Sequence, residues 1–177
     1  MYNGRNSRAQ KIFSKEECEK IINSPSQLIT EDSKEAIEQN KKHHGTYGNY
    51  PAKILDDDTW VRNRIETYVG IVNQKYFNTL YNGVQDYIGI KEYNINDDCE
   101  WHTDVLNGNR RLGVIIPLSL ECEGGDFEFF QGEVFKVKQE VGVAIVFPIF
   151  LYHRVTPITK GKRIALITWT TGEELNW

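Results

Sequence analysis

The chain has 177 residues, of which 40% are apolar and 12% are aromatic. This is enough apolar material to bury about two-thirds of the surface of the unfolded chain in one domain, which excludes an intrinsically disordered protein. The formal net charge is −4 and the basic residues occur only in short, scattered clusters, which argues against a nucleic-acid partner.

Helical patterns dominate the first half of the chain. Residues 14–17 (Ser-Lys-Glu-Glu) have the form of a capping box and predict a helix start. Residues 24–52 are polar and contain glycines and prolines, which predicts a loop with some short structure. Within it, residues 38–52 are a candidate lid over a peptide, with an ordinary surface loop as the alternative. Apolar residues then recur at three- and four-residue steps over 58–80, which predicts one amphipathic helix of about five or six turns.

The second half shows short, β-rich segments separated by turn residues. The expected strands are 87–94, 100–105, 111–119, 126–130, 134–138, 143–147, 152–156 and 163–171. Residues 127–137 predict a hairpin with a Gln-Gly turn. Eight short strands favour a double-sheet jelly roll or a small barrel, and the single change from helices to strands argues against a doubly wound parallel sheet. We expect one domain over 1–177, with helical support over about 1–84 and a β core over about 85–177.

Three side chains of the β-rich part form a candidate metal site. Residues two apart on a strand project to the same face, so His102 and Asp104 can converge on one ion. His153 belongs to a later strand that could lie opposite. Two imidazoles and one carboxylate suit Fe(II) and leave coordination positions open, whereas a structural zinc site is closed by four protein ligands. The alternative is a surface histidine near an aspartate, because an HxD pattern also arises by chance.

Three further residues extend this candidate site. Arg163 opens an apolar run, where its charge is costly unless it meets an anion, and its planar fork matches a carboxylate. A strand-edge arginine that faces water is the alternative. Tyr93 could offer its hydroxyl to the same carboxylate, or be a half-buried strand tyrosine. Trp169 shares the face of Arg163 at strand period, and it either walls the pocket or packs in the core.

Cysteine usage and hydropathy bear on location. Cys18, Cys99 and Cys122 cannot all pair and show no CxxC spacing, so neither a disulfide framework nor a closed cysteine–zinc site is expected. The N-terminal stretch is polar where a secretory signal needs an apolar core. The longest uncharged apolar stretch, 141–152, is shorter than the about 20 residues of a membrane-spanning helix. We therefore expect a cytoplasmic protein with no membrane partner.

Residues 93–169 resemble the prolyl and lysyl hydroxylase group of the 2-oxoglutarate oxygenases, the relatives of prolyl 4-hydroxylase. The matching residues are Tyr93, 101–104 (Trp-His-Thr-Asp), Arg111, 123–126 (Glu-Gly-Gly-Asp), Phe147–Pro148, 153–157 (His-Arg-Val-Thr-Pro), 160–163 (Lys-Gly-Lys-Arg) and Trp169. Asn96 and Cys99 depart from the family, which has a glycine and a second tyrosine there, so the loop over the iron is expected to differ in shape. Leu118 stands about where some prolyl hydroxylases direct another tyrosine towards 2-oxoglutarate.

The resemblance implies a mainly β fold with supporting α-helices, namely a double-stranded β-helix (jelly roll, cupin-like). It implies Fe(II) on His102, Asp104 and His153, and 2-oxoglutarate as a cosubstrate that Arg163 holds. Tyr93 and Trp169 are the further candidates for cosubstrate binding, and ascorbate is a candidate reductant. The implied reaction hydroxylates a C–H bond, as in prolyl 4-hydroxylation of a peptide or protein, and releases succinate and CO2.

Four other functions compete with this interpretation. A small-molecule hydroxylase of the same superfamily is not distinguished by any residue of the chain. A non-catalytic metal-binding cupin-like domain would explain the three metal ligands but not Arg163. A nucleic-acid demethylase usually has a second arginine six residues after the first, where this chain has Trp169. A partner-binding jelly roll without a metal would direct polar residues into a barrel mouth without cause.

Overall fold

The computed structural model describes residues 7–28, 52–105 and 109–173. The candidate lid at 38–52 therefore lies, apart from residue 52, outside the described residues. In chain order the elements are β1 (Arg8–Lys11), α1 (Lys15–Ile22), β2 (Ser26–Leu28), β3 (Ala52–Leu55), α3 (Thr59–Val72), the π-helical segment η1 (Asn73–Phe77), β4 (Gly89–Tyr93), β5 (Cys99–His102), β6 (Arg110–Gly124), β7 (Phe127–Phe130), β8 (Val134–Lys136), β9 (Val143–Pro148), β10 (Tyr152–Val155) and β11 (Ile158–Thr171).

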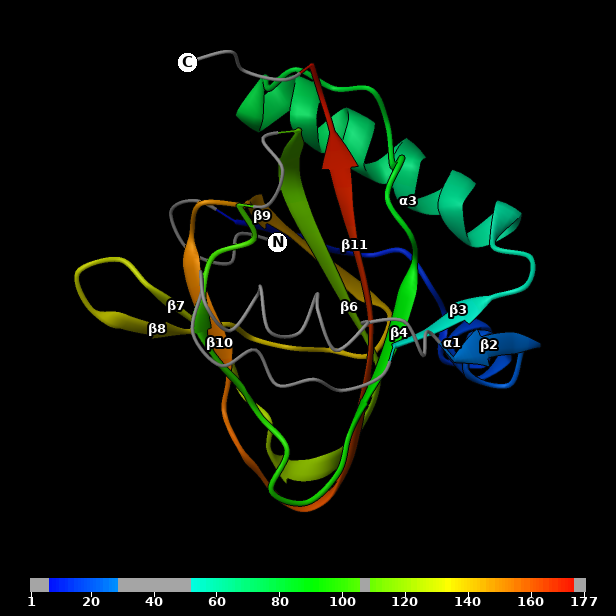
Figure 1. Ribbon diagram of the computed structural model, residues 1–177, viewed down its shortest axis with the longest axis vertical. Helices are drawn as coiled ribbons and strands as arrows, with labels where there is room; N and C mark the ends of the chain where they lie inside the picture. Colours follow the sequence, from blue (N-terminus) through cyan, green and yellow to red (C-terminus); the bar gives the residue numbers. More distant parts are fainter. Residues whose placement is uncertain (1–6, 29–51, 106–108, 174–177) are drawn as a thin grey trace, which may run out of the picture.

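The strands form two antiparallel sheets (Figure 1). The larger sheet has seven strands in the order β1-β9-β6-β11-β4-β3-β2, and the smaller has four in the order β5-β10-β7-β8. The expected jelly-roll (double-stranded β-helix) architecture with supporting helices is confirmed. All eight strands predicted in the second half are present, and β7 and β8 form the predicted hairpin. That the whole chain forms one domain stays a prediction.

Two hydrophobic cores lie on the two faces of the larger sheet. On one face, apolar side chains of α1 and α3 pack against strand residues such as Ile90, Val114 and Leu166. On the other face, residues such as Ile145 and Ile167 meet side chains of the smaller sheet. The second core is the space between the two sheets. Since successive strand residues point to opposite faces, each central strand of the larger sheet contributes to both cores.

The first half of the chain contains both predicted helices and three strands that we did not predict. Ser14 and Glu17 form the expected capping box, with Ser14 N donating to Glu17 Oε2 at 2.8 Å. The second helix was expected to reach residue 80, but α3 continues only as the π-helical turn η1 to Phe77. The helix stops there because Asn78 takes a left-handed conformation with φ 50°. β1, β2 and β3 have only three or four residues each, and β2 falls in the predicted loop. They are strands because they pair at the sheet edges, not because of their own propensity.

Two predicted strands are longer than expected. β6 continues to Gly124 and β11 begins at Ile158, and these extensions pair with each other. Their outward positions carry charged residues, including the ion pair of Lys160 with Glu123 at 2.8 Å. A two-stranded ribbon with charged residues lacks the apolar pattern by which we recognised strands.

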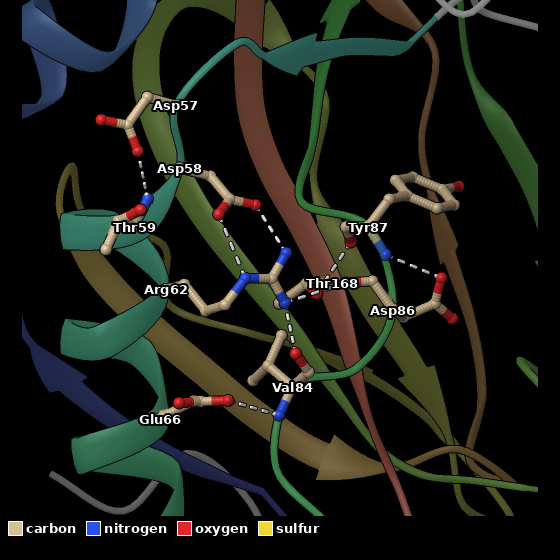
Figure 2. Close-up of polar contacts among 9 residues, drawn as sticks. All are labelled: Asp57, Asp58, Thr59, Arg62, Glu66, Val84, Asp86, Tyr87 and Thr168. Atoms are coloured by element: carbon tan, nitrogen blue, oxygen red, sulfur yellow. Dashed lines mark hydrogen bonds and ion pairs between the residues drawn. The ribbon is translucent and has the colours of Figure 1, made fainter.

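Arg62 fastens α3 to the segment that leads into β4 (Figure 2). Its guanidinium donates to both carboxylate oxygens of Asp58, at 3.1 and 2.5 Å. It also donates to the backbone carbonyls of Val84 and, at 3.1 Å, Asp86. One turn further along the helix, Glu66 Oε1 accepts from Val84 N at 3.0 Å. Polar side chains therefore satisfy the backbone groups of this irregular segment and hold it against the helix.

Among the described residues, no helix has both the length and the apolar character needed to cross a membrane.

The Gly-Gly turn between β6 and β7 packs directly on the segment between β10 and β11. Gly125 N donates to Pro157 O at 3.3 Å, and Thr156 N donates to the carbonyl of Asp126 at 2.9 Å. Asp126 N in turn donates to Thr156 Oγ1 at 2.9 Å. Gly124 and Gly125 have φ of 77° and 68°, which only glycine adopts without strain. The two sequence signatures of the family resemblance, 123–126 and 153–157, are therefore two sides of one contact.

Gly124→Ala should be strongly destabilising, because a Cβ there would lie 2.1 Å from Pro157 O in addition to the unfavourable backbone conformation. Gly132→Ala is the matched control, since Gly132 also has a positive φ of 86° but would place its Cβ in open space. Urea unfolding should show a loss of about 3 kcal/mol or more for Gly124→Ala and about 1 kcal/mol for Gly132→Ala. Equal losses would show that the contact with Pro157 has no energetic weight.

Candidate metal and cosubstrate site

The pairing of β5 with β10 brings two histidines together. His102 and His153 are directly opposite in this antiparallel pair, and their ring centroids are 4.2 Å apart. Their neighbours Trp101 and Tyr152 point to the other face of the small sheet, where their rings stack at 5.4 Å. The alternation of side chains along both strands thus directs the imidazoles into the space between the sheets.

Asp104 completes a group of three convergent side chains. Its backbone N donates to Ile149 O at 2.9 Å, which holds the residue just beyond the end of β5. Asp104 Oδ1 lies 3.6 Å from His102 Nε2, and Oδ2 lies 3.6 Å from His153 Nε2. The three donor atoms lie within 4.8 Å of one another, as expected of atoms that surround a single ion. The predicted convergence is therefore present, while the binding of iron stays a prediction.

Backbone carbonyls set the tautomer of both histidines. His102 Nδ1 lies 2.7 Å from Glu100 O, and His153 Nδ1 lies 2.8 Å from Leu151 O. A carbonyl oxygen can only accept, so in the neutral imidazoles each Nδ1 carries the proton. Each Nε2 then presents its lone pair towards Asp104. This is the arrangement that prepares an imidazole to bind a metal.

The three donors are largely buried beside an aromatic wall. His153 is 3% exposed and Asp104 is 7% exposed. The rings of Phe127, Phe129 and Phe147 surround His153 at centroid distances of 5.5, 6.2 and 4.9 Å. Within the described ranges, no lysine or arginine forms an ion pair with Asp104. A buried carboxylate without a cation is costly, and a metal ion held with the two imidazoles would compensate it.

Arg163 is buried in the centre of the larger sheet. It is 1% exposed and lies opposite Tyr93 of β4 and Leu120 of β6. The alternative of a strand-edge arginine facing water is therefore wrong, because β11 lies between β6 and β4. The guanidinium carbon lies 5.1 Å from the centroid of the Tyr93 ring, while a shared carboxylate ligand of the two residues stays a prediction.

The charge of Arg163 has no anion in the part of the chain that the structure describes. Nη2 donates to Gln139 Oε1 at 2.9 Å, and Nε has no hydrogen-bond partner among the described residues. Burial lowers the pKa of the guanidinium, and the neighbouring Tyr93, Cys122 and Cys99 act in the opposite direction. Arginine nevertheless keeps its proton in proteins. A buried cation with an unused N–H donor fits a carboxylate, as at the distal end of 2-oxoglutarate.

Trp169 is buried in the second core. Its ring packs edge-on against Tyr87 at 5.5 Å, and the guanidinium of Arg110 lies over it at 3.7 Å. Arg110 is itself paired with Asp86 at 2.7 Å. These are the contacts of a core tryptophan, six residues and about 20 Å of strand from Arg163. A contact of Trp169 with a cosubstrate stays a prediction.

The positions that depart from the family pattern have simple structural consequences. Asn96 has φ 72°, the left-handed conformation that glycine adopts readily and asparagine tolerates, so the expected change of loop shape has no support there. Cys99 is buried with its Sγ 3.7 Å from His102 Nδ1. Leu118 packs in the core under the helices, so Leu120, not Leu118, is the β6 residue opposite Arg163. The register of β6 against β11 shifts at Leu118, between the pairs Ser119–Ile164 and Pro117–Ala165, which a strict alternation could not predict.

Gln139 is the site residue that the sequence did not indicate. It stands between Lys138 and Glu140 in a charged stretch before β9, where a glutamine is normally solvated. Its contact with Arg163 joins residues 24 positions apart. No local pattern marks such a contact.

Known proteins resemble part of this chain in sequence. The family model of the 2OG-Fe(II) oxygenase superfamily matches residues 88–171. A PKHD-type hydroxylase of Alteromonas mediterranea is 42% identical over 67 residues, which are 37% of this chain and 30% of that protein. A PKHD-type hydroxylase of Shewanella frigidimarina is 30% identical over 92 residues, which are 44% of this chain and 39% of that protein. The chain thus spans less than half the length of these curated relatives.

Solved structures share the fold over nearly the whole chain. The viral collagen prolyl hydroxylase of Paramecium bursaria Chlorella virus-1, as its 2OG complex, has a TM-score of 0.70 at 15% identity. The match covers 96% of this chain and 98% of the viral protein. A prolyl-4-hydroxylase of Pseudomonas putida has a TM-score of 0.66 at 14% identity. The match covers 95% of this chain and 93% of that protein. Residues 88–171 of the chain are thus similar in sequence to the 2OG-Fe(II) oxygenase superfamily, and the chain shares the fold of two prolyl hydroxylases.

Proposed function

We propose that the protein is an Fe(II)- and 2-oxoglutarate-dependent dioxygenase that hydroxylates a prolyl residue of a peptide or protein and releases succinate and CO2. One observation carries the dioxygenase activity. Among the described residues, the space between the sheets holds a buried carboxylate that pairs with no lysine or arginine and a buried arginine that pairs with no carboxylate. Fe(II) and 2-oxoglutarate are the pair of ligands that would compensate both charges.

The donor set fits Fe(II). His102 Nε2, His153 Nε2 and one oxygen of Asp104 would hold the ion, and three protein ligands leave coordination positions open for other ligands. The backbone carbonyls of Glu100 and Leu151 hold the imidazoles in the ligating tautomer, as described above. When bound, the iron supplies the activation of dioxygen, and the chain supplies position and a water-poor surrounding.

Arg163 would hold the distal carboxylate of 2-oxoglutarate. Its Nε offers an unused donor, and the Tyr93 ring packs beside the guanidinium. A charge-assisted hydrogen bond in this buried position is stronger than its equivalent in water. A non-catalytic metal-binding cupin-like domain has no use for this arginine, so Arg163 favours the oxygenase.

The substrate class rests on the relatives. Two sequence relatives are PKHD-type hydroxylases, and two of the structures that share the fold are prolyl hydroxylases. We therefore propose a proline-containing peptide or protein as the substrate, not a nucleic acid. We also propose a reducing, cytoplasmic location, because Cys18, Cys99 and Cys122 are all free thiols.

The site should assemble in two separable parts. Anaerobic protein with Fe(II) and 2-oxoglutarate should develop a weak visible band at about 500 nm, typical of 2-oxoglutarate chelated to Fe(II) in such a donor set. Asp104→Ala should lose the metal. Arg163→Met should keep the metal and bind 2-oxoglutarate about 100-fold more weakly, the equivalent of about 3 kcal/mol for a charged hydrogen-bonded contact.

Arg154→Met is the matched control for Arg163→Met. Arg154 lies on β10, the strand that precedes β11 in the chain, but it pairs with Glu128 at 2.8 Å. It should bind both ligands like the wild type. Arg163→Met should also unfold no more easily than the wild type in the absence of ligands, because it removes a buried charge that has no counter-ion. If wild-type protein gives no band and no 2-oxoglutarate affinity, the oxygenase proposal is wrong.

Hydroxylation should be visible by mass. Proline-containing peptides incubated with protein, Fe(II), 2-oxoglutarate, ascorbate and air should gain one oxygen, with one succinate formed per oxygen transferred. Asp104→Ala is the inactive control. Succinate formed without any gain in the peptides would point to the small-molecule hydroxylase. An absence of both products would point to the non-catalytic metal-binding domain.

A further inference from the structure

Gln139 connects Arg163 to the Gly-Gly turn. Its Oε1 accepts from Arg163 Nη2 at 2.9 Å, and its Nε2 donates to Gly125 O at 3.0 Å. The two partners allow one orientation of the amide, because a guanidinium can only donate and a carbonyl can only accept. Gly125 also packs against the same arginine, since a Cβ on it would lie 3.0 Å from Arg163 Cδ. The turn and the amide therefore hold Arg163 from two directions.

Gln139 holds the arginine without neutralising it. The acidic residues of the neighbouring turn are committed to lysines: Asp126 pairs with Lys136 at 2.7 Å, and Glu123 pairs with Lys160 at 2.8 Å. An amide is thus a hydrogen-bonding partner of Arg163 at a position where a carboxylate of the same shape would fit. A carboxylate would form an internal ion pair and occupy the charge that a bound anion needs.

We infer that Gln139 is a positioning residue for the cosubstrate, one that orients Arg163 and, by being neutral, leaves its positive charge for the distal carboxylate of 2-oxoglutarate. This rests on the function proposed above, in which Arg163 binds that carboxylate. The residue acts through Arg163 and does not itself touch the reacting atoms.

Gln139 lines a surface pocket, so its side chain can be changed without disturbing the core. A cavity of about 520 Å³ has Gln139, Leu120, Cys122 and Lys138 in its wall. Gln139 itself is half-buried, whereas Arg163 behind it is fully buried. A change from amide to carboxylate at Gln139 preserves size and shape and leaves one side of the group near water. The variant should therefore fold.

Gln139→Glu tests the inference by anaerobic titration of the Fe(II) protein with 2-oxoglutarate. Lys138→Gln is the matched control, because it changes the net charge by the same amount on the same pocket wall, at a residue paired with Glu140 instead of Arg163. We expect Gln139→Glu to weaken 2-oxoglutarate binding about tenfold or more, since the new carboxylate competes for Arg163 at hydrogen-bond distance. The affinity for Fe(II) alone should be unchanged, and Lys138→Gln should resemble the wild type.

Two further measurements distinguish a charge effect from general damage. Binding of 2-oxopentanoate, a 2-oxo acid that lacks the distal carboxylate, should be the same in the wild type and in Gln139→Glu. The melting temperature of ligand-free Gln139→Glu should be equal to or above that of the wild type, while its increase on addition of 2-oxoglutarate should be smaller.

The outcomes separate this inference from the proposed function. If the wild type binds 2-oxoglutarate and Gln139→Glu binds it within twofold of the wild type, Gln139 has no positioning role. Equal weakening of 2-oxoglutarate and 2-oxopentanoate would likewise overturn the inference, because the defect would not involve Arg163. If the wild type binds no 2-oxoglutarate, the proposed function fails and the inference fails with it.

Discussion

The antiparallel pairing of β6 with β11 is the contact on which the rest of the structure depends. The two strands pair from Gly124 and Ile158 at one end to Arg110 and Thr171 at the other, in the middle of the larger sheet. One face of the pair carries the core under the helices, and the opposite face carries Arg163 into the space between the sheets. The same hydrogen-bonded ladder therefore supports the hydrophobic core and positions the charged group of the site.

The site combines side chains from both sheets. The small sheet and the residue just beyond β5 supply two histidines and a carboxylate, and the large sheet supplies an arginine. Each charged group would be costly in a dry interior by itself, and among the described residues neither is neutralised by a partner of opposite charge. The folded chain thus holds a buried negative charge on Asp104 and a buried positive charge on Arg163, and each can bind a ligand of opposite charge. Such an interior would gain stability if a cation and an anion bound there together.

The pattern of turns and β-rich runs was sufficient to predict eight strands, because the residues that end a strand act locally. The glycines of the Gly-Gly turn are an example: their positive φ angles are local, but the packing of Gly124 on Pro157 is not. The edge strands β1 and β2 were missed because their residues have little β propensity. They become strands only by pairing with β9 and β3, and no local pattern reports which partner is near.

By itself, the sequence determined the types of donor at the site and the spacing of His102 and Asp104, because the two-residue period of a strand is a local property. It also indicated that an arginine stands at the start of an apolar run. Only the tertiary structure decided that His153 lies opposite His102, that Arg163 is buried without a carboxylate among its described neighbours, and that it donates a hydrogen bond to Gln139. These contacts depend on strand register and on the packing of one sheet over the other, which arise from the whole chain and not from any one segment.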